Sequence, residues 1–266
     1  MYPFSYQRAD TLSATVAALA ADPDAKAIAG GMTLIPSMKH RLAAPGRLID
    51  ITRLAELQGI DAEDGWLRIG AATRHRDVAS ETVAAHIPAL ARLAHTIGDP
   101  QVRARGTLGG SVANADPAAD YPAALLALAA IVVTDRREIT ADDFFVDMFT
   151  TALEPDELIR SIRFRIPRRA AYAKFHHPAS GYAMTGVCVA ELDGAVRVGV
   201  TGAAPVPFRW QAAEEALSPT PTSAGLEGLS YPPDGLNADM HAPAEYRAHL
   251  VAVMTRRALG AMENDQ

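Results

Sequence analysis

Short apolar stretches alternate with amphipathic segments in the first part of the chain. Residues 26–29 and 48–51 have the pattern of short buried strands, whereas apolar residues recur at helical spacing in 11–21 and 34–42. A short edge strand is expected at 4–7. This order predicts a compact β-α-β unit whose first strand-to-helix loop is rich in glycine.

The middle of the chain mixes the two periodicities. Residues 66–69 and 131–134 read as strands, and 158–166 (LIRSIRFRI) alternates strongly between apolar and polar positions. Helices are expected at 74–79 and 87–94. A hairpin strand at 137–139 and a helical turn at 141–145 complete this part.

The last hundred residues have a different character, and Pro167-Arg168-Arg169 marks the boundary before them. Two apolar segments around Asp193-Gly194 predict a β-hairpin, because this dipeptide favours a two-residue turn. The remaining segments comprise hairpin strands at 184–192 and 196–202, a strand-like stretch at 172–176, a short helix at 212–217, a loop at 218–239 and an amphipathic helix at 244–262.

Composition excludes several classes of protein. The chain has 266 residues, 49% hydrophobic and 21% charged, so it can bury a sizeable core of two or three lobes. A net charge of -6 argues against nucleic acid as the main partner. The single cysteine, Cys188, excludes an intrachain disulfide and an iron–sulfur cluster built from this chain alone.

The N-terminal segment does not resemble a signal peptide, because Arg8 and Asp10 interrupt it. No apolar run approaches the roughly 20 residues that a membrane-spanning helix needs. We therefore expect a soluble cytoplasmic protein without a transmembrane segment.

Two glycine pairs are the strongest chemical signal. Gly30-Gly31 and Gly109-Gly110 lie roughly eighty residues apart, and each is expected between a strand and a helix. Adjacent glycines let a bulky anion approach the main chain, and a helix N-terminus offers it free N–H groups. Two such loops favour one extended ligand, such as a diphosphate-bridged dinucleotide. Neither pair fits the Rossmann or P-loop pattern.

Several other residues are candidates for binding or for a structural role. Asp120 could accept hydrogen bonds from sugar or polyol hydroxyls, or it could cap the following helix. Arg103 and Arg105 could balance phosphate charge or form a solvated basic patch. Lys174 reads as a surface charge, and Cys188 as a core residue. Asp116 is expected to cap a helix. His176 and His177 are adjacent on a strand and point to opposite faces, so they predict no metal site.

No nucleophile, base and orienting residue form a recognisable set, so any chemistry is expected from a bound cofactor. Residues 29–51 (AGGMTLIPSMKHRLAAPGRLIDI) and 97–128 (IGDPQVRARGTLGGSVANADPAADYPAALLAL) closely resemble the FAD-binding medium subunit of molybdenum hydroxylases. The resemblance is to the aerobic carbon monoxide dehydrogenase type of this subunit and to the similar module of xanthine dehydrogenase. The order of elements agrees over nearly the whole chain.

The resemblance implies an α+β fold with three domains. Two α/β FAD-binding subdomains of the vanillyl-alcohol-oxidase type (PCMH-like) would span residues 1–55 and 56–167. A small C-terminal domain, residues 168–266, would contain a three-stranded sheet with helices. FAD would lie between the lobes. It would be bound non-covalently, because no histidine is placed for covalent attachment.

The resemblance also assigns roles to residues. Asp120 would bind the ribityl or ribose hydroxyls, Ile97 and Ile159 would line the cofactor, and the charge of Lys174 could stabilise the reduced, anionic flavin. Tyr182 would lie over the isoalloxazine and gate the electron acceptor, and is the candidate catalytic residue. The diphosphate would rest on two loops: Ile28, Ala29, Gly30, Gly31, Met32, Thr33 and Leu34 in the first, and Thr107, Gly109, Gly110 and Ser111 in the second.

Three positions depart from the family pattern. Met32 stands where His or Thr is usual, Thr33 where Ser is usual, and Ser111 where Asn is common. Backbone N–H groups could still make the phosphate contacts, so the departures affect only side-chain contacts from these positions.

The family further implies partners. A large subunit would carry the molybdenum cofactor and a small subunit two [2Fe–2S] clusters, together forming a dimer of heterotrimers. The complex would be cytoplasmic, free or held at the inner face of the membrane. FAD would receive electrons from the clusters and pass them to quinone, NAD or oxygen. Three alternatives stay open: a self-contained FAD enzyme of the same superfamily, a scaffold subunit without FAD, and a nucleotide-binding regulatory module.

Overall fold

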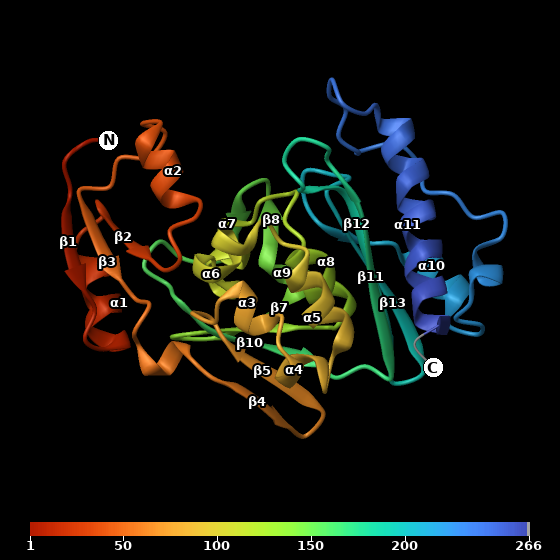
Figure 1. Ribbon diagram of the computed structural model, residues 1–266, viewed down its shortest axis with the longest axis horizontal. Coiled ribbons are helices and arrows are strands. Elements are labelled where there is room, and N and C mark those ends of the chain that lie inside the picture. The colour runs from red at the N-terminus through yellow and green to blue at the C-terminus, as the bar shows by residue number, and fades with distance from the viewer. Residues whose placement is uncertain (265–266) are drawn as a thin grey trace.

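Three units lie side by side along the long axis of the molecule, and each is built around its own sheet (Figure 1). The computed structural model describes residues 1–264. Each of the main sheets lies within one of the three predicted domains; the exact boundaries remain predictions. Among the described residues, no helix has the length and apolar character needed to cross a bilayer.

The N-terminal unit is a three-stranded parallel sheet of order β1-β3-β2. Parallel neighbours require crossover connections, and two helices provide them. Thr11 begins the first helix by accepting a hydrogen bond from the N–H of Ala14. The elements are β1 (Ser5–Arg8), α1 (Leu12–Ala21), β2 (Ala25–Ile28), α2 (Leu34–Lys39) and β3 (Arg47–Asp50), followed by the 3-10 turn η1 (Ala55–Leu57).

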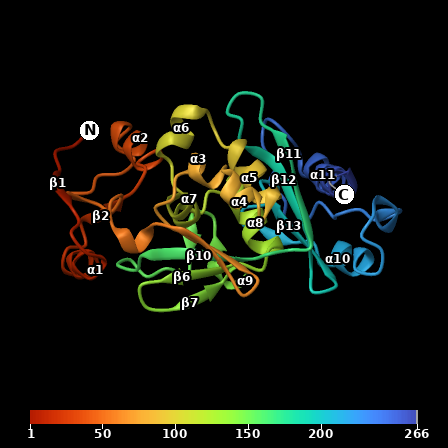
Figure 2. The ribbon, with the colours of Figure 1, turned by 60° about the horizontal axis from the view of Figure 1, so that its bottom comes forward.

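The middle unit is a five-stranded antiparallel sheet of order β4-β5-β10-β6-β7. Its helices gather on one side of the sheet (Figure 2), and the core between them includes Tyr121, Phe144 and Phe164, all fully buried. The elements are β4 (Ile60–Glu63), β5 (Trp66–Gly70), α3 (His75–Val78), α4 (Glu81–Ala84), α5 (Pro88–His95), α6 (Pro100–Arg105), α7 (Leu108–Asn114), α8 (Tyr121–Ala127), β6 (Ile131–Thr134), β7 (Glu138–Thr140), α9 (Ala141–Phe144), β8 (Phe145–Asp147), β9 (Thr150–Thr151) and β10 (Ile159–Arg165).

The C-terminal unit is an antiparallel sheet of order β11-β12-β13-β14. All ten residues of β12 are buried, because both faces of the sheet are covered. Val187 and Val189 pack into the core beneath α11, whereas Cys188 and Ala190 belong to the core of the middle unit. The elements are β11 (Arg169–His176), β12 (Ala183–Leu192), β13 (Ala195–Thr201), β14 (Phe208–Arg209), α10 (Gln211–Leu217), η2 (Ser223–Leu226) and α11 (Ala244–Asn264).

The α+β class is confirmed, with one difference in the last sheet. The three expected strands are present, and the two-residue strand β14 adds a fourth at the edge of β13. The turn η2 lies within the segment expected to be a loop, and β4 and the β8–β9 hairpin were not predicted. These elements are two to four residues long, too short for a periodic pattern.

Candidate functional site

The first glycine loop joins the end of β2 to the start of α2, as predicted. Gly31 has φ +72°, a left-handed conformation that glycine adopts without steric cost. None of the backbone N–H groups of residues 30–34 donates a hydrogen bond to another described residue. This run of free donors at a helix start can bind an anion.

The second glycine pair differs from its prediction. It follows helix α6 rather than a strand, and it lies inside the first turn of α7. The N–H groups here are already used: that of Gly109 donates to the carbonyl of Ala71 at 2.8 Å, and that of Gly110 to Thr107 Oγ1 at 3.2 Å. The prediction of free donors in this loop was therefore wrong, because Thr107 and the turn after β5 accept them.

The two loops lie against each other. A Cβ atom on Gly30 would come within 2.2 Å of the carbonyl oxygen of Arg105 and 2.7 Å of Gly106 Cα, so only glycine fits there. Gly110 is exposed, and a Cβ placed on it would lie 4.0 Å from the Cβ of Ala29. The exposed backbone of α7 thus lies beside the free N–H groups of the first loop.

Asp120 lies at the start of α8, is only 5% exposed and has two partners from β11. Lys174 Nζ lies 2.8 Å from Asp120 Oδ1, and the Tyr172 hydroxyl donates to the same oxygen at 2.6 Å. Burial raises the pKa of Asp120, and the Lys174 charge opposes this rise. No described residue donates to Oδ2, so that oxygen can accept a hydrogen bond from a ligand hydroxyl.

Two alternative readings are thereby excluded. Asp120 occupies the N-cap position of α8, but its side chain makes no capping hydrogen bond, so the carboxylate does not act as a cap. The side chain of Lys174 is 3% exposed and is not a surface charge. Asp116 supports the turn ahead of α8 by accepting a hydrogen bond from the N–H of Ala118.

Lys174 also reaches the segment that contains Ile97. Its Nζ donates to the carbonyl of Thr96 at 3.3 Å. Arg103 holds the same segment, because its Nη1 donates to the carbonyls of Ile97 and Gly98 at 3.1 and 2.8 Å. Arg103 therefore orders a loop of the site. Ile159 lies in the core of the middle unit on β10, 6% exposed, and its contact with the cofactor stays a prediction.

Tyr182 lies in the loop between β11 and β12 and is 48% exposed. The next residue, Ala183, donates its N–H to the carbonyl of Ala118 at 3.3 Å, which holds the loop beside the segment that leads to Asp120. Partial burial and then the charges of Asp116 and Asp120 raise the pKa of the Tyr182 phenol. Nearby, the ring of His177 packs against that of His241 at 4.5 Å.

Tyr172, Gly106 and His75 belong to the site but were not predicted from the sequence. Tyr172 had a usable signal: it lies two residues before Lys174 on a strand, so both side chains face Asp120. Gly106 and His75 come together only through the tertiary fold.

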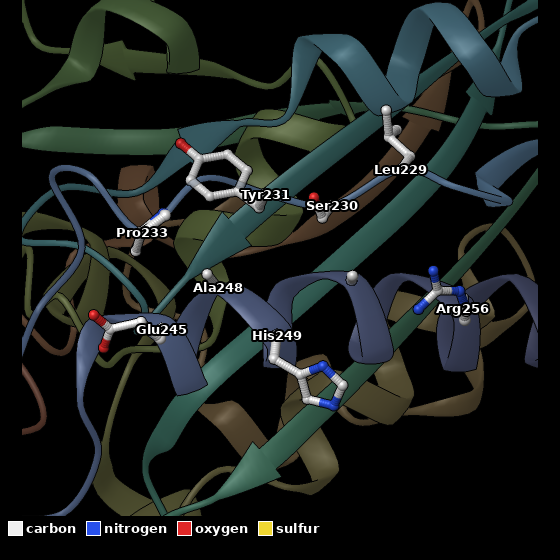
Figure 3. Close-up of a pocket in the computed structure, with 9 residues that line it drawn as sticks. Leu229, Ser230, Tyr231, Pro233, Glu245, Ala248, His249 and Arg256 are labelled. Carbon is white, nitrogen blue, oxygen red and sulfur yellow. The ribbon is translucent and has the colours of Figure 1, made fainter.

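A pocket on the outer face of the C-terminal unit is separate from this site (Figure 3). Residues of α11, Glu245, His249 and Arg256, line it together with Tyr231. No residue predicted to bind FAD belongs to it.

The site as a whole fits a ligand with a diphosphate and several hydroxyls. Free amides at residues 30–34 suit the diphosphate, and Oδ2 of the buried Asp120 suits a hydroxyl donor. Comparison with known proteins agrees. Residues 2–168 match the family described as "FAD binding domain in molybdopterin dehydrogenase".

Relatives match over most of the chain. The nicotine 6-hydroxylase medium subunit of Paenarthrobacter nicotinovorans is 36% identical over 91% of this chain and 90% of its own. The carbon monoxide dehydrogenase medium chain of Hydrogenophaga pseudoflava is 34% identical over 97% of this chain and 96% of its own. A solved structure of reconstituted carbon monoxide dehydrogenase from Oligotropha carboxidovorans aligns with a TM-score of 0.87 and 32% identity, covering 99% of both chains.

The fold and site thus define an FAD-binding oxidoreductase subunit. The chain belongs to the FAD-binding medium subunits of the molybdenum hydroxylase family, which confirms the resemblance found in the sequence.

Proposed function

We propose that this chain carries electrons within a molybdenum hydroxylase complex, from [2Fe–2S] clusters of a partner subunit to an external acceptor. Bound FAD supplies a group that can take electrons singly and release them in pairs. The observation that carries the proposal is the run of free backbone N–H groups at residues 30–34, together with the buried carboxylate of Asp120 at the start of α8.

In this proposal the chain's own residues hold the cofactor. The N–H groups of residues 30–34 bind the diphosphate, and the exposed backbone of Gly110 lets it approach. Asp120 Oδ2 accepts a hydrogen bond from a ribityl or ribose hydroxyl. Lys174 supplies positive charge near the flavin, and Tyr182 covers the ring and limits access of the acceptor.

The side chains of Met32, Thr33 and Ser111 are not required by this arrangement. Met32 is 38% exposed, and the free donors at 32 and 33 belong to the backbone. The departures from the family pattern therefore do not favour a scaffold that has lost FAD.

The proposal includes partners of two kinds: a large subunit with the molybdenum cofactor and a small subunit with the clusters, arranged as a dimer of heterotrimers. One cysteine in this chain supports a division of labour, because four ligands are needed for a cluster. We expect the complex in the cytoplasm, free or at the inner face of the membrane.

The test is the visible spectrum of the purified chain. It is recorded for the chain alone and again after incubation with FAD and removal of free flavin. Retained, roughly stoichiometric flavin that dithionite bleaches is expected, and Asp120→Ala and Gly110→Val should weaken retention. Since assembly can raise cofactor affinity, the test is repeated with co-expressed partner subunits. Absence of flavin in both would refute the function, and substrate turnover by the chain alone would favour the self-contained enzyme.

A further inference from the structure

A buried histidine stands behind the junction of the two glycine loops. His75, the first residue of α3, is 4% exposed. Its backbone N–H donates to the carbonyl of Gly106 at 2.9 Å. Its ring covers the same residue: a Cβ on Gly106 would lie 2.6 Å from His75 Nε2 and 2.7 Å from Cδ2.

Gly106 in turn supports the first loop. Its Cα would lie 2.7 Å from a Cβ placed on Gly30, at the start of the run of free N–H groups. The ring of His75, the Arg105–Gly106 peptide and Gly30 therefore form three successive layers in contact. A side chain fits neither on Gly106, which faces His75, nor on Gly30, which faces the peptide. The position of the His75 ring therefore sets how closely the segment at Gly106 approaches the first glycine loop.

The other side of the ring is bonded to the helix that begins next to Asp120. His75 Nδ1 lies 3.1 Å from the hydroxyl of Tyr121, and the two rings are 5.5 Å apart. Tyr121 is the first residue of α8 and is fully buried. The bond thus connects the glycine junction to the residue that follows Asp120.

We propose that His75 is a positioning residue for FAD, which sets the spacing between the loop that binds the diphosphate and the carboxylate that binds a hydroxyl. This inference rests on the proposed function. His75 touches neither loop amide nor Asp120 directly; it acts through Gly106 and through Tyr121.

The bond to Tyr121 can be removed from either end: Tyr121→Phe deletes only the hydroxyl, whereas His75→Phe also introduces a larger ring. His75→Phe and Tyr121→Phe each delete one partner, and the double variant deletes both. Without the bond the glycine junction and the start of α8 are no longer held at a fixed spacing, so each single variant is expected to bind FAD roughly tenfold more weakly. The double variant should bind no more weakly than the worse single variant, because both changes remove the same bond. The control is His95→Phe, an exposed histidine on α5.

The dissociation constant of FAD is measured by flavin fluorescence on folded protein, next to the thermal midpoint of the FAD-free protein. A purely structural role would lower the midpoint and leave the FAD affinity of folded protein at the wild-type value, which would overturn the inference. Independent effects, multiplied in the double variant, would overturn it as well. If His75→Phe does not fold, Tyr121→Phe decides alone. If wild-type protein binds no FAD, with or without partners, the proposed function fails first.

Discussion

Replacing Lys174 by methionine isolates the buried ion pair at the centre of the site. Methionine keeps an unbranched chain of similar length and removes the ammonium group 2.8 Å from Asp120 Oδ1. Asp120 then keeps the Tyr172 hydroxyl as its one described donor and remains 5% exposed.

The expected loss follows from this burial. Removing one partner of a buried ion pair destabilises a protein by about 3 to 5 kcal/mol, because the remaining charge is uncompensated. Burial already raises the pKa of Asp120, and losing the Lys174 charge raises it further. The variant can therefore bind a proton at Asp120 in the folded state where the unfolded chain has released it.

The sign of the pH dependence is fixed by that proton. Above the unfolded pKa and below the raised folded pKa, the folded state binds more protons, so stability falls as pH rises by about 1.4 kcal/mol for each pH unit. Lys174→Met should therefore be closer to the wild type at pH 5 than at pH 8.

Denaturant unfolding at both pH values measures the difference, with Lys26→Met as control, because Lys26 is an exposed lysine on strand β2. The control should change the free energy of unfolding by less than about 0.5 kcal/mol. An equal loss for Lys174→Met at pH 5 and pH 8, or a loss no larger than that of the control, would refute the assignment of a buried, charge-dependent pair.

Three further predictions follow from other parts of the site and core. Gly30→Ala should lower the thermal midpoint and abolish FAD retention, because its Cβ would lie 2.2 Å from the Arg105 carbonyl oxygen. The control is Gly260→Ala in α11, where a Cβ meets no atom within 4 Å, and it should be neutral or slightly stabilising in thermal unfolding. Burial and then the Arg103 charge lower the pKa of His75 to about 4, below its ordinary 6.5. His75 should therefore make stability fall by about 1.4 kcal/mol for each pH unit between 6.5 and 4, and the slope of the wild type should exceed that of His75→Phe by this amount; equal slopes in acid unfolding curves would contradict it. Burial raises the pKa of Cys188 to about 12, so a thiol reagent should label it only in denatured protein, and labelling of the native state would contradict that burial.

The sequence predicted the local elements of the first loop better than those of the second. Residues 26–29 are strand-like and residues 34–42 recur at helical spacing, so Gly30-Gly31 had to lie between them. Around Gly109 no strand precedes the pair, and the acceptors of its N–H groups are Ala71 and Thr107. Ala71 is nearly forty positions away, and no local pattern reveals such a partner.

Lys174 illustrates a second limit. Alternation along 172–176 indicates that Tyr172 and Lys174 share a face of the strand, but not what covers that face. The middle unit covers it: α8 and α5 pack against the C-terminal sheet, which places Asp120 and Thr96 beside Lys174. A lysine on an otherwise ordinary strand therefore reads as exposed until the tertiary structure is known.

The same pair resolves an electrostatic conflict within the site. A carboxylate close to a diphosphate would repel it, yet the proposed ligand needs an acceptor for its hydroxyls. Lys174 neutralises Asp120 through Oδ1, and Oδ2 remains available to the ligand. In Lys174→Met a loss of FAD affinity is therefore expected at pH values where Asp120 stays ionised, and this loss follows from Asp120 alone. The predicted action of Lys174 on the flavin is tested instead by the reduction potential of bound FAD: it should fall in Lys174→Met if the ammonium stabilises the anionic reduced ring, and an unchanged potential would assign Lys174 to Asp120 only.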